Sequence, residues 1–71
     1  MTKKDHIKIA DAIVNTYNEL SNKQVEARYL NNFIHVVTGK FIVSLQADSN
    51  LFDWQVFISY INKKIGLNIL D

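Results

Sequence analysis

The polar residues that could take part in chemistry are few, and the first set lies in the middle of the chain. Arg28, Asn31 and His35 fall on one side of a helix drawn through this stretch. An arginine beside a histidine could bind an anion, and the imidazole could act as a base. No nucleophile or carboxylate stands at helical spacing from them to complete an acid–base set. We therefore interpret them as solvated surface, and we expect neither catalytic residues nor enzyme activity.

The second set consists of Asp48 and Asp53, which could be a pair of metal-binding carboxylates. Their surroundings favour another interpretation, because Asp48 lies in a turn-like segment and Asp53 directly precedes an apolar helical pattern. The chain has no cysteine, and its two histidines are too few for a structural metal site without help from carboxylates. We expect no metal and no other cofactor.

The composition describes a small domain with an excess of apolar residues. The 71 residues form one domain, 1–71, near the size at which a single core is barely sufficient. Hydrophobic residues make up 48% of the chain, which favours packing against another chain. The formal charge is only +1, and the signs are mixed along the chain, with Lys3, Lys4 and Lys8 at one end and Lys63 and Lys64 near the other. Nucleic-acid binders usually concentrate positive charge on one face, so we do not expect nucleic acid as a partner.

Two observations concern membranes and targeting. No apolar run is long enough to cross a bilayer, so we expect no membrane association. The N-terminal segment is interrupted by Asp5, His6, Lys8 and Asp11, whereas a secretory signal needs an unbroken apolar region. These residues predict a cytoplasmic protein.

The first expected element is a helix over residues 3–20. Thr2 and Asp5 have the spacing of a capping box, with aspartate in place of the usual glutamate. Apolar residues then recur at helical spacing: Ile7, Ala10, Ile13, Val14, Tyr17 and Leu20. We expect Ser21 and Gln24 to form the capping box of the next helix, and the short connection predicts that the two helices are antiparallel neighbours.

The second expected element is a long helix over residues 22–46. Its apolar residues cover about half of the circumference or slightly more, and the polar remainder consists of Arg28, Asn31, Asn32, His35 and Thr38. A helix with so wide an apolar surface must be packed by more than one neighbour. We therefore predict an all-α, three-helix domain whose central helix is long and largely buried.

A β-hairpin is the alternative for part of this segment. Residues 34–45 are rich in β-branched side chains, and Thr38-Gly39 could form the turn. An isolated hairpin is marginal in water, and no other segment has the pattern of a strand. We favour the helix, in which Gly39 lies on the mostly polar side and permits a close approach or a bend.

The third expected element is a helix over residues 54–65. Phe52, Asp53 and Phe57 occupy the N′, N-cap and N4 positions of a hydrophobic staple, and Asp53 also favours the positive end of the helix dipole. One stripe should face the core, and it consists of Trp54, Ile58, Ile61 and Ile65. Gly66 is suited to end the helix in the left-handed conformation, and Leu67 could then pack back on Ile61.

Two segments resemble a known group of proteins. Thr2-Lys-Lys-Asp-His-Ile-Lys-Ile-Ala-Asp-Ala-Ile13 is similar to the start of small, mostly uncharacterised proteins encoded by phages and prophages. Their C-terminal pattern has an acid, then Phe-Asp, then another Phe, and this chain matches it with Asp48, Phe52, Asp53 and Phe57. The chain departs from the group in having residues 49–51 as Ser-Asn-Leu instead of Asn-Pro-Arg, and His6 instead of tyrosine. The resemblance implies a phage or prophage origin and a helical fold, and it carries no activity.

These observations lead to three functional hypotheses. The first is a phage-encoded accessory protein that binds a host or phage protein, and the resemblance implies inhibition of a host defence or a host enzyme in the bacterial cytoplasm. Its candidate contact surface is Val56, Tyr60 and Ile42, because the first two point away from the Trp54 stripe and Ile42 is a lone apolar residue on a polar side. The alternatives are a DNA-binding regulator of helix-turn-helix type and a structural homo-oligomer.

Overall fold

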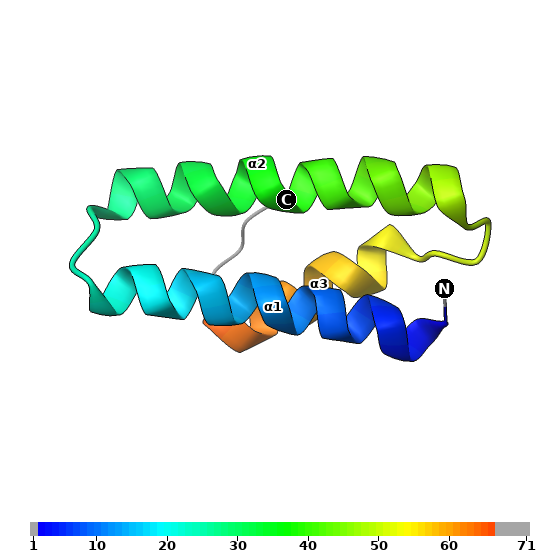
Figure 1. The fold of residues 1–71 in the computed structure, drawn as a ribbon, viewed down its shortest axis with the longest axis horizontal. Coiled ribbons are helices and arrows are strands. Elements are labelled where there is room, and N and C mark those ends of the chain that lie inside the picture. Colours follow the sequence, from blue (N-terminus) through cyan, green and yellow to red (C-terminus); the bar gives the residue numbers. More distant parts are fainter. Residues whose placement is uncertain (1, 67–71) are drawn as a thin grey trace.

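The computed structural model describes residues 2–66, and the fold it shows is all-α (Figure 1). Helix α1 spans Lys3–Asn22, α2 spans Ala27–Asp48 and α3 spans Trp54–Ile65. The prediction of a three-helix domain is confirmed. The segment 34–45 lies inside α2, so the hairpin alternative is wrong.

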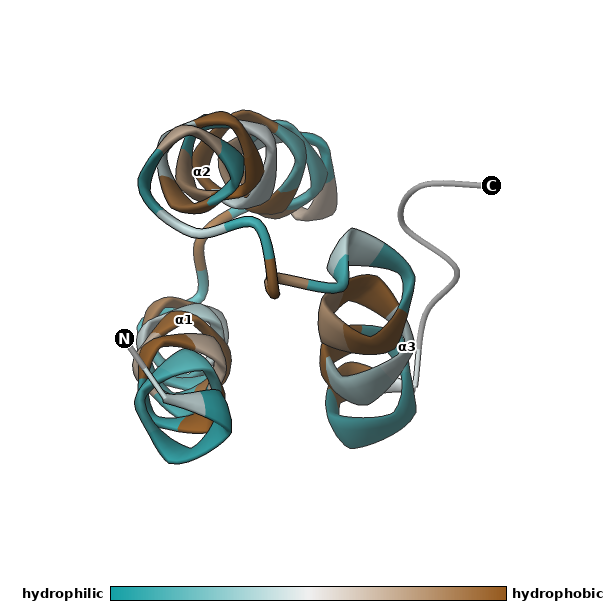
Figure 2. Ribbon diagram, turned by 90° about the vertical axis from the view of Figure 1, so that its right-hand side faces the viewer, coloured by the Kyte–Doolittle hydropathy of each residue, from teal (hydrophilic) through white to brown (hydrophobic). Residues whose placement is uncertain are grey.

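The two long helices form an antiparallel pair, and α3 packs against one end of it. Figure 1 shows that this end is made by the N-terminal half of α1 and the C-terminal half of α2. Seen along the pair, the three helices stand at the corners of a triangle (Figure 2). α1 packs extensively against both other helices, whereas the contact between α2 and α3 is small.

One core cluster joins the three helices. Ile34 of α2 and Ile61 of α3 are its most deeply buried apolar residues, both 0% exposed. The cluster consists of Ala10, Ile13, Val14, Ile34, Leu45, Phe52, Phe57 and Ile61. Burial of this apolar surface is the main source of stability available to a chain without disulfides.

The start of α1 is closed by the predicted capping box. The Thr2 hydroxyl accepts the backbone N–H of Asp5 at 3.4 Å, and the Asp5 carboxylate accepts the backbone N–H of Thr2 at 2.9 Å. The second of these hydrogen bonds favours the ionised carboxyl and lowers the pKa of Asp5. The box therefore satisfies donors that the first turn of a helix leaves open.

The start of α2 differs from the prediction. Ser21 lies in the last turn of α1, and Gln24 adopts a left-handed backbone with φ of 63°, so the predicted capping box between them is wrong. α1 continues to Asn22, and the connection uses the next residues to reverse direction. α2 then begins at Ala27 behind Glu26, whose side chain makes no capping hydrogen bond.

Both ends of α3 match the sequence prediction. The Asp53 carboxylate accepts the backbone N–H groups of Gln55 and Val56 at 3.0 and 3.2 Å. The rings of Phe52 and Phe57 meet edge to face with centroids 5.3 Å apart, which is the contact of a hydrophobic staple. Gly66 ends the helix with φ of 74°. The predicted contact of Leu67, and the tail that follows it, lie outside the described residues.

α2 is less buried than its sequence predicts. Its buried residues are Leu30, Ile34, Thr38 and Leu45, which lie on one face. Thr38 was expected among the polar residues of the surface but is 0% exposed, and its hydroxyl has no hydrogen-bond partner among residues 2–66. A methyl group at Gly39 would meet no atom of the described residues within 4 Å, so this glycine serves no close approach among residues 2–66.

Candidate functional site: the α1–α3 pocket

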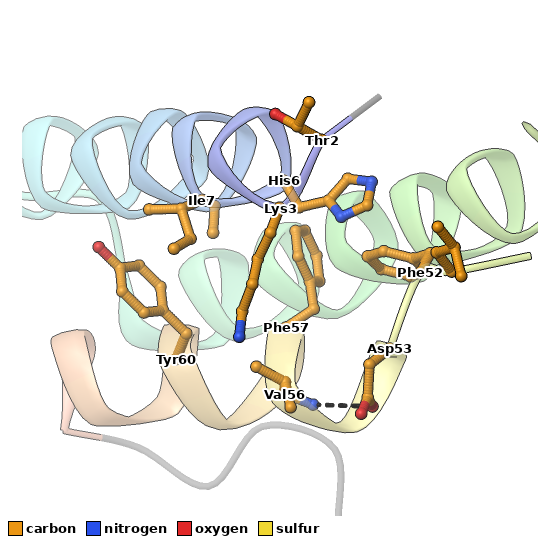
Figure 3. Close-up of a pocket in the computed structure, with 11 residues that line it drawn as sticks. Thr2, Lys3, His6, Ile7, Phe52, Asp53, Val56, Phe57 and Tyr60 are labelled. Atoms are coloured by element: carbon orange, nitrogen blue, oxygen red, sulfur yellow. Dashed lines mark hydrogen bonds between the residues drawn. The ribbon is translucent and has the colours of Figure 1, made fainter. Parts of the chain in front are cut away.

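A pocket of about 320 Å³ lies between the N-terminal parts of α1 and α3 (Figure 3). We call it the α1–α3 pocket. The turn that precedes α3 forms one of its walls. Its lining residues are Thr2, Lys3, His6, Ile7, Ala10, Leu51, Phe52, Asp53, Val56, Phe57 and Tyr60.

The rim of this pocket exposes large apolar side chains to water. Leu51 is 90% exposed, Val56 52% and Ile7 39%. Single exposed apolar residues are ordinary on a protein surface, but a group of them around one concavity is typical of a binding site. The rim therefore offers apolar surface to a ligand that can enter the pocket.

The floor of the pocket is aromatic and contains a buried histidine. Phe52 and Phe57 are both buried, and the ring of His6 meets that of Phe52 edge to face at a centroid distance of 4.9 Å. The Nε2 atom of His6 is buried and has no hydrogen-bond partner in the described part of the chain, which is costly for a polar atom. Sequence analysis did not assign His6 a place in a site, although it stands one turn before Ala10 on the buried face of α1.

Tyr60 connects α3 to α1 at the far wall of the pocket. Its hydroxyl donates a hydrogen bond to the Asp11 carboxylate with an O···O distance of 2.5 Å. An ionised phenolate would lose this hydrogen bond and face a negative charge, so the contact raises the pKa of Tyr60. Lys64 lies over the same ring, with its ammonium 5.6 Å from the ring centroid. These contacts fix the ring that bounds the pocket.

The charged residues of the pocket have different roles. The Asp53 carboxylate is engaged by the backbone N–H groups at the start of α3. Lys3 is exposed, and its side chain extends from α1 toward α3 across the pocket (Figure 3). A bound partner would therefore meet a mobile positive charge at the mouth and apolar surface below it.

The structure brings together two of the three residues predicted for a contact surface. Val56 and Tyr60 both line the α1–α3 pocket. Ile42 does not line it; this residue is half-buried and packs against the core cluster, so its placement on a polar side is wrong. Ile42 follows the buried Thr38 by one helical turn, so the two residues lie on the same face of α2. The prediction that this face is exposed is therefore wrong for both.

Trp54 also differs from its predicted place. The first residue of α3 is 42% exposed and is not part of the core cluster. The end of the core that Trp54 was expected to fill is occupied by Phe52 from the preceding turn. Ile58 and Ile61 are buried and Ile65 packs against the core, so the rest of the predicted stripe is correct.

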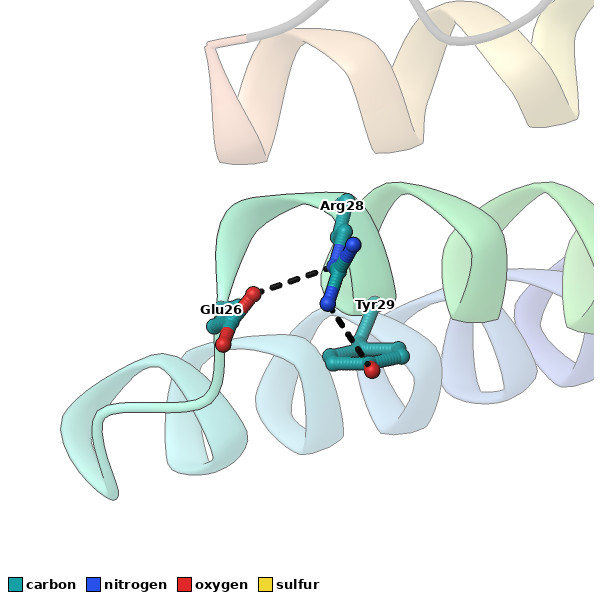
Figure 4. Close-up of polar contacts among 3 residues, drawn as sticks. All are labelled: Glu26, Arg28 and Tyr29. Atoms are coloured by element: carbon teal, nitrogen blue, oxygen red, sulfur yellow. Dashed lines mark hydrogen bonds and ion pairs between the residues drawn. The ribbon is translucent and has the colours of Figure 1, made fainter.

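The other candidate groups have structural partners or lie in solvent. Arg28 pairs with Glu26 at 3.0 Å, donates to the Tyr29 hydroxyl at 3.2 Å and lies over the Tyr29 ring (Figure 4). His35 is exposed, and Asp48 is the last residue of α2. Among residues 2–66, no group of three or more histidine, cysteine or acidic side chains is arranged to hold a metal ion. No helix in this range is both long and apolar enough to span a bilayer.

A second concave surface lies between α1 and α2. This groove also measures about 320 Å³, and no residue of α3 lines it. Its lining is almost entirely apolar and consists of Ile9, Ala12, Ile13, Thr16, Phe33, Val37 and Phe41. The exposed apolar surface of this domain is therefore not confined to the α1–α3 pocket.

Comparisons of the chain with protein-family models, with curated proteins and with solved structures find no significant match. The assignment of function must therefore start from the geometry of the α1–α3 pocket.

Proposed function

We propose that this chain is a non-enzymatic interaction module that binds a partner protein through the α1–α3 pocket. The observation that carries the proposal is the exposed apolar rim around an aromatic floor. Interfaces of this kind take their affinity from a large apolar side chain that enters a pocket and is shielded from water. Tyr60, whose residue type is enriched at such contacts, stands on the same wall as the exposed apolar Val56.

The pocket also indicates the chemistry of the partner segment. Phe52 and Phe57 below the rim favour an aromatic or large aliphatic anchor. Lys3 at the mouth favours a carboxylate close to that anchor, since opposite charges increase the rate and specificity of association. The fitting partner is therefore a segment with one large apolar side chain and an acidic neighbour.

The biological role that fits this module is that of a phage- or prophage-encoded accessory protein. Support comes from the resemblance of residues 2–13, and of the pattern made by Asp48, Phe52, Asp53 and Phe57, to phage proteins. In this role the module binds a host or phage protein in the bacterial cytoplasm, and inhibition of a host defence or of a host enzyme is the expected consequence.

Capture from a bacterial lysate tests the proposal when it is combined with two matched variants. The tagged chain is incubated with nuclease-treated lysate, and the retained proteins are identified by mass spectrometry. Val56→Asp places a charge on the rim, and it should not disturb the helix because an acid in the first turn is favourable. Val43→Asp is the control, since Val43 is 68% exposed on α2 and does not line the pocket.

The expected result is a stoichiometric protein that the wild type and Val43→Asp retain and Val56→Asp loses. Circular dichroism must show that both variants remain helical. Retention by Val56→Asp and by Leu51→Asp alike would contradict the pocket as the binding surface. A parallel capture from untreated lysate is the second control, and binding seen only without nuclease would favour the DNA-binding alternative instead.

A further inference from the structure

The outer face of α2, which points away from the core, carries exposed apolar residues at a regular spacing. Tyr29 is 56% exposed, Val36 50% and Val43 68%. They stand seven residues apart, so they lie nearly above one another on the helix. No residue of the α1–α3 pocket belongs to this face.

The same face continues as a seam of six positions, alternately four and three residues apart. We call it the outer seam, and its members are Tyr29, Phe33, Val36, Lys40, Val43 and Ala47. At about 100° per residue, all six stay within about 40° of a common line along the helix. This alternation is the spacing by which one helix packs on another in a coiled coil. Phe33 is half-buried at the edge of the groove between α1 and α2, and the other five are exposed.

The spacing of the outer seam is the same in both directions along the helix. A second copy in antiparallel orientation therefore matches it position by position: Tyr29 meets Ala47 of the other copy, Phe33 meets Val43, and Val36 meets Lys40. Each outer layer combines a large side chain with a smaller one. In the central layer the alkyl part of Lys40 can cover Val36 while its ammonium group reaches water.

Charge favours this orientation over a parallel one. In a parallel pair in register, the two Lys40 ammonium groups would share one layer and repel each other. The antiparallel pair separates them, because each lysine then faces a valine. In coiled coils, a lysine at one position of the core seam is a known way to specify how the helices pair.

We propose that two copies of this chain associate through their outer seams, antiparallel about a two-fold axis near the middle of α2. The contact is closed and self-complementary, as in most homodimers. It also supplies the neighbour that the wide apolar surface of α2 requires and that residues 2–66 do not provide. The seam spans about 27 Å, a small interface, so we expect a dissociation constant on the order of micromolar.

Analytical ultracentrifugation over a wide concentration range tests the association. The wild type should change from monomer to dimer as the concentration rises. Val36→Asp, at the centre of the seam, should remain monomeric at all concentrations. Val56→Asp is the matched control, because Val56 is 52% and Val36 50% exposed, and it should dimerise like the wild type. The same control loses the proposed partner protein, so the two proposals fail separately.

Disulfide crosslinking tests the orientation of the two copies. Because the chain has no cysteine, only the introduced cysteines can form a disulfide. Under oxidation, a mixture of Tyr29→Cys and Ala47→Cys chains should form a disulfide between the two variants, whereas neither variant alone should form one. Crosslinking of each variant with itself would show a parallel pair and overturn the proposed arrangement.

Two further results would overturn the proposal itself. One is a wild-type chain that stays monomeric at every concentration. The other is a dimer that survives Val36→Asp but is lost in Phe41→Asp, because this would place the contact in the groove between α1 and α2.

Discussion

α3 and α2 are held in the fold by different kinds of contact. α3 is positioned by directional interactions: the Asp53 cap, the Phe52–Phe57 staple and the hydrogen bond from Tyr60 to Asp11. α2 begins without a side-chain cap, and its one fully buried polar side chain, Thr38, has no hydrogen-bond partner among the residues that the structure describes. Its position depends on apolar packing along one face.

This difference separates the two apolar surfaces of the molecule. The α1–α3 pocket lies between elements whose relative position is fixed by polar and aromatic contacts, so its shape is set before a partner arrives. Such preorganisation lowers the entropic cost of binding. The outer seam of α2 is a stripe on a regular helix that no other described element covers, and it gains burial when another helix packs on it.

The largest expected effect on stability comes from the packing of α3 in the core cluster. Ile61 is 0% exposed in the core cluster, and Ile61→Ala should lower the free energy of unfolding by about 3 kcal/mol, because the cavity adds to the lost burial. Val43→Ala, in the outer seam, should change it little when measured below the concentration of self-association. Urea denaturation followed by circular dichroism measures both values. Equal losses would show that the described burial does not distinguish the two surfaces.

The helix ends were largely predictable because they depend on neighbours in sequence. Thr2 with Asp5, Asp53 with the following N–H groups, and Gly66 in the left-handed conformation all act within a few residues. The exception is the start of α2, where α1 continues past Ser21. The capping pattern is present there, but α1 extends two residues beyond its predicted end and includes Ser21, the first residue of the pattern.

The burial of individual side chains was less predictable because it depends on distant segments. Thr38 and Ile42 face the core only because α1 and α3 approach α2 from that side. Trp54 is displaced from the core by Phe52, and His6 becomes buried because the turn before α3 covers it. The helical period predicts on which face of a helix each residue lies. It does not predict which face another segment of the folded chain will cover.

The next effect is expected at Thr38. Its hydroxyl is fully buried and unpaired, so Thr38→Val should raise the free energy of unfolding by about 1 kcal/mol, since it removes a polar group whose desolvation is not compensated. Thr16→Val is the control, because the Thr16 hydroxyl is exposed and donates to the Ala12 carbonyl at 2.8 Å. Thermal unfolding compares the stability of the two variants with that of the wild type. A loss of stability in Thr38→Val would mean that its hydroxyl has a partner in solution.

The starts of α3 and α2 should respond unequally to the loss of their N-cap side chains. Asp53→Ala removes the cap of α3 and should lower the free energy of unfolding by about 1 kcal/mol. Glu26→Ala should change it by a few tenths at most, because Glu26 makes no capping hydrogen bond and its ion pair with Arg28 is exposed. Equal shifts of the denaturant midpoint in both variants would contradict the conclusion that α3 begins with a stabilising side-chain cap and α2 does not.

The smallest effect is the contribution of Tyr60 to the pH dependence of stability. The hydrogen bond to Asp11 raises the pKa of Tyr60 above its ordinary value of 10.0, so the folded state holds this proton more tightly than the unfolded state does. The resulting stabilisation is fully present below the unfolded pKa and is lost as the pH rises through the folded pKa. Absorbance titration of the phenolate, taken as the difference between wild type and Tyr60→Phe, isolates this group from Tyr17 and Tyr29. Asp11→Asn should return the pKa toward its ordinary value. An unchanged titration in Asp11→Asn would mean that the hydrogen bond from Tyr60 to Asp11 is not formed in solution. The wall of the α1–α3 pocket would then lack this fixed polar contact, and the contrast with the outer seam would be weaker.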